Sequence, residues 1–153
     1  MAFSTKISCA FALVVSGFMA NAVMAQSTAD APARTPKISL ELNNASNTES
    51  KGCQLTFVVT NHSDTGLSQI AYQVGVFDAN GIVSRILVME FGALTSGKTK
   101  IALFNLADQP CTDISRIIVN DVAQCTLAEN SEAADFCLSG LSTKSRADID
   151  FGL

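Results

Sequence analysis

The chain has 153 residues, a formal net charge of −4 at pH 7, five cysteines, one tyrosine and no tryptophan. Its 14 acidic residues outnumber its 10 basic residues and are scattered along the chain, which argues against nucleic acid as a partner. This length favours one domain that is large enough to bury a hydrophobic core.

Residues 1–25 have the layout of a secretory signal peptide. Lys6 is the only early charge, residues 7–22 are largely apolar, and the small side chain of Ala25 precedes the expected cut. The apolar run is shorter than the ~20 residues that a membrane span needs. We therefore expect a Sec-type signal, a periplasmic or secreted protein, and no integral membrane segment after cleavage.

Residues 26–37 contain serine, threonine, aspartate and two prolines among alanines. This composition is typical of a flexible leader. The folded domain is then expected to span residues 38–153.

Alternation of apolar and polar side chains predicts six strands in the first part of this domain, because a strand with one buried face shows that period. The expected strands are residues 38–42, 54–59, 68–76, 82–91, 100–104 and 114–122. Polar, small residues between them, such as 43–52, predict loops.

The clearest of these elements is one β-hairpin over residues 68–91. Apolar side chains recur at every second position from Ile70 to Val76. Asp78 can open a turn through a side-chain hydrogen bond, and the Asn-Gly pair that ends at Gly81 tolerates positive φ.

The pattern changes after the sixth strand. Residues 126–140 hold alanine, leucine and glutamate without a β-branched run, which favours a helix. Thr126 with Glu129 fits a capping box, and Gly140 fits a helix stop. Residues 147–151 are a candidate seventh strand.

Six or seven short strands with polar turns predict an all-β fold, an immunoglobulin-like two-sheet antiparallel sandwich with one short helix near the C-terminus. Four cysteines follow the expected signal, and an even number in an exported chain indicates disulfides. Zinc is the alternative, but its sites usually show closely spaced ligands. With immunoglobulin-like strand order, Cys53 and Cys111 lie at one end of the sandwich and Cys125 and Cys137 at the other. We therefore expect Cys53–Cys111 and Cys125–Cys137.

The stretch from Gly92 to Thr99 matches the P-loop pattern letter for letter. In a nucleotide enzyme Lys98 would reach the β- and γ-phosphates and Thr99 would hold Mg²⁺. A P-loop needs a helix that begins at its lysine. The residues after Lys98 alternate instead, with Ile101 and Leu103 set against their neighbours. We interpret the stretch as a hairpin loop with a solvated lysine and expect no nucleotide cofactor.

The remaining motifs are also interpreted structurally. His62 has Ser63 and Asp64 beside it in one polar turn, whereas a catalytic triad needs these groups to converge from separate elements. The turn at Asp78 resembles part of a Ca²⁺ loop without its later acidic ligands. Asn44 and Asn61 begin glycosylation sequons. We expect no catalytic residue and no metal site.

Apolar strand residues offer the last candidate surface. Met89, Phe91 and Phe104 could form an apolar binding patch, but burial in the core is the better interpretation for alternating apolar residues. An edge strand could also recruit an extended partner by β-augmentation, that is, by pairing with an added strand. The sequence does not reveal which edge is open.

Residues 72–83, with the sequence YQVGVFDANGIV, resemble the core of bacterial FxLYD-type extracellular sandwich domains. In that family an aromatic-Asp turn and a glycine lie between two apolar strands, and an asparagine, here Asn61, often follows the preceding strand. The similarity covers roughly residues 55–104. Phe77 replaces the family's tyrosine, and the cysteines are additional. The resemblance implies an immunoglobulin-like sandwich in the bacterial envelope without catalytic residues. The whole chain also resembles exported proteins of Gram-negative bacteria.

These observations leave three hypotheses. The first is a non-catalytic periplasmic adaptor domain that binds an envelope protein through a strand edge or a loop end. The second is a structural or surface-assembly subunit that exchanges strands with its neighbours and forms oligomers. The third is a nucleotide-binding enzyme that uses the stretch from Gly92 to Thr99.

Overall fold

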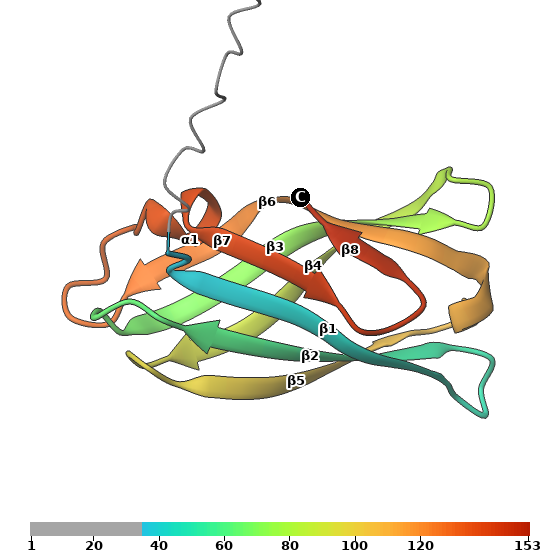
Figure 1. Ribbon diagram of the computed structural model, residues 1–153, viewed down its shortest axis with the longest axis horizontal. Helices are drawn as coiled ribbons and strands as arrows, with labels where there is room; N and C mark the ends of the chain where they lie inside the picture. The colour runs from blue at the N-terminus through green and yellow to red at the C-terminus, as the bar shows by residue number, and fades with distance from the viewer. Residues whose placement is uncertain (1–34) are drawn as a thin grey trace, which may run out of the picture. The chain divides into compact units, whose positions relative to one another are not determined.

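The computed structural model describes residues 35–153, which form a two-sheet β-sandwich (Figure 1). The predicted signal peptide, residues 1–25, and most of the predicted leader lie outside the described residues. The predicted all-β sandwich is therefore confirmed. Within the described part, no helix is long and apolar enough to cross a membrane.

The elements follow one another along the chain as eight strands, one 3-10 turn and one short helix. Their bounds are β1 (Ile38–Asn47), β2 (Cys53–Asn61), β3 (Leu67–Asp78), β4 (Val83–Leu94), β5 (Thr99–Leu106), η1 (Cys111–Asp113), β6 (Ile114–Leu127), α1 (Phe136–Ser139), β7 (Leu141–Ser145) and β8 (Asp150–Gly152).

The strands form two sheets of four, with the orders β5-β2-β1-β7 and β4-β3-β6-β8. The expected antiparallel pairing is wrong at two places, because β1 pairs with β7 and β6 pairs with β8 in parallel. The first parallel pair begins where Gly140 accepts hydrogen bonds from the backbone N–H groups of Lys37 and Ile38, at 2.9 and 3.1 Å. This contact places Ile38 beside Leu141, and both strands then run the same way (Figure 1).

The core follows from the alternation of side chains. In β2 the buried residues are Cys53, Leu55, Phe57 and Val59, and those between them are partly exposed. Phe57 lies at the centre of an aromatic cluster, with ring centroids 6.1 Å from Phe91, 6.0 Å from Phe104 and 5.2 Å from Phe151. These edge-to-face contacts join both sheets through one residue.

The strand β5 alternates as expected, but Ala102 and Phe104 face the core while Ile101 and Leu103 do not. Leu55 and Phe57 of β2 point inward, and their register partners are Phe104 and Ala102. Because directly opposite residues share a face of the sheet, Ile101 and Leu103 point outward. They are 67% and 58% exposed.

The expected helix over residues 126–140 is wrong for most of its length. β6 continues to Leu127, and the chain then folds back so that Ala134 N donates to Cys125 O at 2.9 Å. Only Phe136–Ser139 is helical. Pairing with β3 overrides the weak helix propensity of this stretch. The capping box from Thr126 is therefore not formed, whereas Gly140 does end the helix.

Two further strand assignments differ from expectation. β1 continues to Asn47, into the predicted loop 43–52, because its second half stays paired with β2 beyond an irregularity between Leu42 and Asn44. β7 lies in a polar stretch where no strand was predicted, and the expected strand 147–151 is reduced to β8.

Candidate functional site

The four cysteines form the two disulfides Cys53–Cys111 and Cys125–Cys137, which are the two pairs that the sequence predicted. The first ties the start of β2 to the turn η1 after β5. The second ties β6 to α1. All four residues are therefore structural crosslinks, and the described residues contain no cluster of three or more His, Cys, Asp or Glu that could hold a metal.

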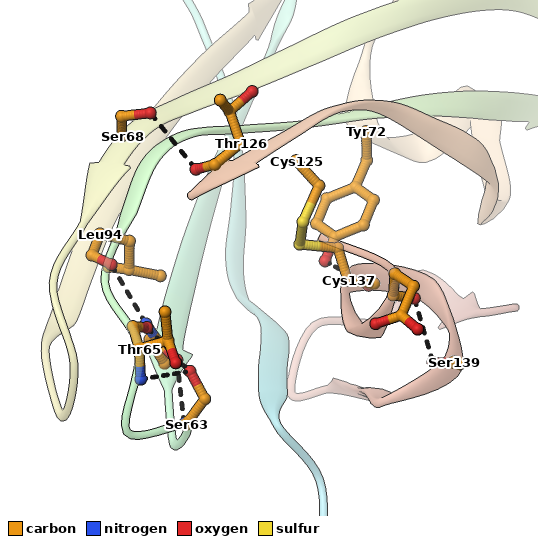
Figure 2. The surroundings of a disulfide bond; sticks show 11 residues. Ser63, Thr65, Ser68, Tyr72, Leu94, Cys125, Thr126, Cys137 and Ser139 are labelled. Carbon is orange, nitrogen blue, oxygen red and sulfur yellow. Dashed lines mark hydrogen bonds between the residues drawn. A yellow bond between two sulfur atoms is a disulfide. The ribbon is translucent and has the colours of Figure 1, made fainter. Parts of the chain in front are cut away.

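The second disulfide lies beside the buried ring of Tyr72 (Figure 2). The Tyr72 hydroxyl donates to the carbonyl oxygen of Cys137 at 2.8 Å. Burial raises the pKa of Tyr72 above its ordinary value, because the phenolate would lose its hydration. This tyrosine therefore acts as a neutral hydrogen-bond donor that positions α1.

The P-loop-like stretch connects a strand of one sheet to a strand of the other, and no helix follows it. Its first residues end β4, its last residue, Thr99, begins β5, and Lys98 N closes the turn on Thr95 O at 3.1 Å. Gly97, with φ of 69°, takes the left-handed conformation that this turn needs. Because β4 and β5 belong to different sheets, the expected hairpin loop is wrong in detail. Lys98 is exposed, as expected.

Asn61 is a fully buried hub of hydrogen bonds. Its amide nitrogen donates to Thr65 O at 2.9 Å and to Leu94 O at 3.1 Å. Its amide oxygen accepts from the backbone and the hydroxyl of Ser63. Ser96 then donates to Ser63 O, so the network joins the β2–β3 loop to the β4–β5 turn. The Asn61 sequon is inaccessible in the folded chain, whereas Asn44 is exposed.

The other predicted motifs have structural contacts. His62 Nε2 lies 2.9 Å from Ser39 Oγ on an exposed surface. The hydrogen-bond partner of the imidazole is therefore Ser39 and not the adjacent Ser63 or Asp64. Asp78 Oδ1 accepts from Asn80 N and Ile82 N at 2.8 and 2.9 Å, which confirms the turn. The third candidate group, Met89, Phe91 and Phe104, packs in or against the core, as predicted.

Two surface pockets of about 530 and 520 Å³ lie at the ends of the sandwich. One lies between Pro36 and Phe136, and the other is lined by Asn44 and Arg146. The described residues do not place a nucleophile beside a buried general base in either pocket.

The β7 and β8 side of the sandwich is short and charged. The exposed charged side chains here are Lys144, Arg146, Asp148 and Asp150. The pKa of Glu41, on the adjacent β1, is lowered by a hydrogen bond from Asn43 and by Arg146, whose Nε lies 2.7 Å from it. Short edge strands with charged side chains discourage pairing with other chains.

The opposite side, formed by the edge strands β4 and β5, carries most of the exposed large hydrophobic side chains of the described residues. Within the described residues, the large exposed hydrophobic side chains on or beside these two strands are Ile82, Val83, Ile86, Val88, Ile101 and Leu103. The two others are Leu138, in α1, and Leu153, directly after β8. The outer face next to Ile86 continues over Gly75, its register partner, to Ile118 of β6. We call β4 and β5 with these side chains the open edge.

Two basic side chains bridge the gap between the sheets at the open edge. Lys100 Nζ, from β5, donates to Phe91 O of β4 at 2.5 Å. Arg85 Nη2, from β4, donates to Ala107 O, just after β5, at 3.2 Å. The two bridges therefore lie at opposite ends of β4 and hold the two edge strands together.

Pairing irregularities limit the regular part of β4. Ser84 and Phe91 have no Cα partners in β3, because the register shifts at both positions. The residues between them, Arg85 to Glu90, pair regularly with β3. Bulges terminate strand pairing, so this six-residue stretch is the part of β4 suited to accept another strand.

Comparisons with known proteins find a structure with a similar fold but do not assign the chain to a family. No family model matches the chain, and no curated protein matches it. Among solved structures, one described as the structural characterisation of IrmA from Escherichia coli is similar. It shares 16% sequence identity, covers 71% of this chain and 91% of its own, and has a TM-score of 0.53. At this identity the likeness concerns the fold alone, and the resemblance to FxLYD-type domains stays a prediction.

Sequence reasoning named edge strands as a possible surface but not which edge. The signal was present in β5, where both alternate faces are apolar, with Ile101 and Leu103 on one and Ala102 and Phe104 on the other. A strand that is apolar on both faces lies either in the interior or at an interaction surface. The contrast with the polar β7 could have indicated that β5 is the exposed one.

Proposed function

We propose that this protein is an exported, non-catalytic domain of the bacterial envelope that binds another protein by adding an extended segment of that protein to β4. The observation that carries the proposal is the contrast between the two sides of the sandwich. The β7 and β8 side is short and charged, whereas the open edge exposes six large apolar side chains. An exposed edge strand that carries apolar side chains is suited to pair with an added strand.

The proposed compartment follows from the crosslinks and from the predicted signal. Disulfides form and persist in oxidising compartments such as the periplasm. Two disulfides lie in the described residues, one of them with both sulfurs in largely buried residues. The predicted signal peptide, residues 1–25, provides the export route to that compartment.

The proposal is tested with a photo-crosslinking amino acid at Ile86, on β4, and at Lys144, on β7, as the matched control. Cells that export each variant are irradiated, adducts are identified by mass, and the purified complex is compared with the free protein by amide hydrogen exchange. We expect adducts with a different protein from position 86 alone, and slower exchange at residues 85–90.

Other outcomes reject the proposal in distinct ways. Adducts from both positions, or unchanged exchange at residues 85–90, would show that strand addition at β4 is not the binding mode. Adducts of position 86 with a second copy of this chain, together with a mass that grows with concentration, would support the surface-assembly subunit instead.

A further inference from the structure

We infer that the segment bound at β4 is an apolar strand with an acidic residue at each end. The inference rests on the proposed function, because it specifies the chemistry of the segment that strand addition requires. It is carried by Arg85 and Lys100, the two bridging cations of the open edge.

Neither cation has an acidic partner in the described residues. The ion pairs within 4.0 Å there join Glu41 to Lys144 and Arg146, on the opposite side of the molecule. Arg85 and Lys100 donate instead to backbone carbonyl groups. A guanidinium has five N–H donors and an ammonium has three, so each cation retains donors for an incoming carboxylate.

The inner and outer faces of β4 determine where an added side chain would point. Arg85, Leu87 and Met89 face the gap between the sheets, whereas Ile86 and Val88 face outward. Residues directly opposite each other in a ladder share a face. A side chain opposite Arg85 would therefore point toward its guanidinium, and side chains opposite the next residues would contact apolar surface on both faces.

The second cation sets the length of the segment. Lys100 Nζ lies at Phe91 O, so the two cations mark positions 85 and 91 of β4, about 20 Å apart for an extended strand. One acidic residue opposite Arg85 and a second just past the regular stretch, near position 91, would enclose five residues. Four of the five lie opposite apolar residues, and the one opposite the exposed Glu90 should be uncharged.

The protein as a whole is acidic, with a formal net charge of −4 at pH 7. Glu90 points outward from β4, and the exposed Asp108 forms no ion pair within 4.0 Å with Arg85 or Lys100. The inner face of the open edge therefore presents positive charge at both ends and apolar side chains between. This pattern is complementary to a segment with acidic ends and an apolar centre. It disfavours segments with basic ends, because like charges that face each other repel.

The probe is the acetylated peptide Glu-Thr-Val-Leu-Val-Thr-Glu with flanking glycines, whose symmetry serves both strand directions. A second peptide carries Gln in place of both Glu residues. Binding to the full exported chain is followed by the amide chemical shifts of residues 85–90 at low and high salt. Two partly exposed ion pairs predict roughly fivefold to tenfold tighter binding of the Glu peptide at low salt, and salt should reduce this ratio.

Variants separate this inference from the proposed function. In the Arg85→Gln/Lys100→Gln double variant we expect the two peptides to bind equally. In Arg85→Gln alone the preference for the Glu peptide should be reduced but not lost. Lys144→Gln is the matched control and should preserve the ratio. Equal binding of both peptides to the unmodified chain, with shifts at residues 85–90, would overturn the inference and leave the proposed function standing. A preference that survives in the double variant would also overturn it. No shifts with either peptide would overturn both.

Discussion

The Tyr72 hydroxyl and the Cys137 carbonyl oxygen, 65 residues apart in the sequence, are joined by a buried hydrogen bond of 2.8 Å. Tyr72 belongs to β3, in the centre of the second sheet, and Cys137 to the single turn of α1. The disulfide from Cys137 to Cys125 lies beside the same ring (Figure 2). A covalent bond and a hydrogen bond thus attach one short helix to neighbouring strands.

This contact predicts an alkaline transition. Burial raises the pKa of Tyr72 in the folded state above its unfolded value of about 10. The stabilisation is therefore fully present below pH 10 and is lost as the pH rises above that value, because only the unfolded chain ionises there. Tyr72 is the only tyrosine in the chain. Absorbance at 295 nm should show phenolate appearing together with unfolding, and a separate, earlier ionisation in a folded chain would contradict the assignment.

Removing the Asn61 amide should destabilise the fold. Asn61→Ala removes the side-chain donor to the Leu94 and Thr65 carbonyl groups and the side-chain acceptor of the Ser63 N–H, at a cost of about 2 to 4 kcal/mol. Asn61→Asp, which keeps the shape but cannot donate, should cost nearly as much. Urea denaturation measures both variants. His62→Ala, at the adjacent exposed residue, is the control and should change stability by less than about 0.5 kcal/mol.

The two disulfides should contribute unequally to the free energy of unfolding. Cys53 and Cys111 are separated by 58 residues and Cys125 and Cys137 by 12. Loop entropy then predicts losses of about 4 and about 3 kcal/mol when each pair is replaced by alanine. Guanidinium denaturation of the two paired variants gives the ranking. A larger loss for Cys125/Cys137 would mean that the contacts of α1, including that of Tyr72, matter more than chain entropy.

Lys98→Ala should leave the protein unchanged in stability, because Lys98 is an exposed turn residue. ATP with Mg²⁺ should not raise the melting temperature of either form, since β5 follows the turn where a P-loop would place a helix. Lys100→Ala is the informative contrast, because it removes the bridge to Phe91 O and should lower stability. A rise in melting temperature with ATP that Lys98→Ala abolishes would revive the enzyme hypothesis.

Local patterns predicted those parts of the fold that local interactions determine. The β3–β4 hairpin and its turn followed from the alternation after Ile70 and from Asp78, whose side chain does cap the turn. The disulfide partners followed from strand order, because Cys53 pairs with Leu106 at the end of the antiparallel β5 and the chain reaches Cys111 shortly afterwards.

Elements that depend on distant partners were missed. Thr126 lies in β6 because β3 supplies a partner at Gln69, and no local signal records that pairing. β7 is polar and short, so only its parallel register with β1, beginning at Ile38, makes it a strand. The open edge was likewise missed, because the two apolar faces of β5 also fit an interior strand, and only the pairing of distant strands determines which strands end each sheet. Alternation shows that a strand has two faces, whereas strand order decides which of them meets solvent.

The two parallel pairs have a consequence for the order in which the molecule can be assembled. β7 extends the first sheet and β8 the second, so the segment from Leu141 to Gly152 supplies the outer strand of both. A ribosome or a translocation channel delivers this segment after every other strand. Until it arrives, β1 and β6 are unpaired edge strands, and the charged side chains of this segment do not yet cover them. The nascent chain is thus most vulnerable to wrong association before the segment from Leu141 to Gly152 has paired, and variants in which these residues cannot pair should aggregate.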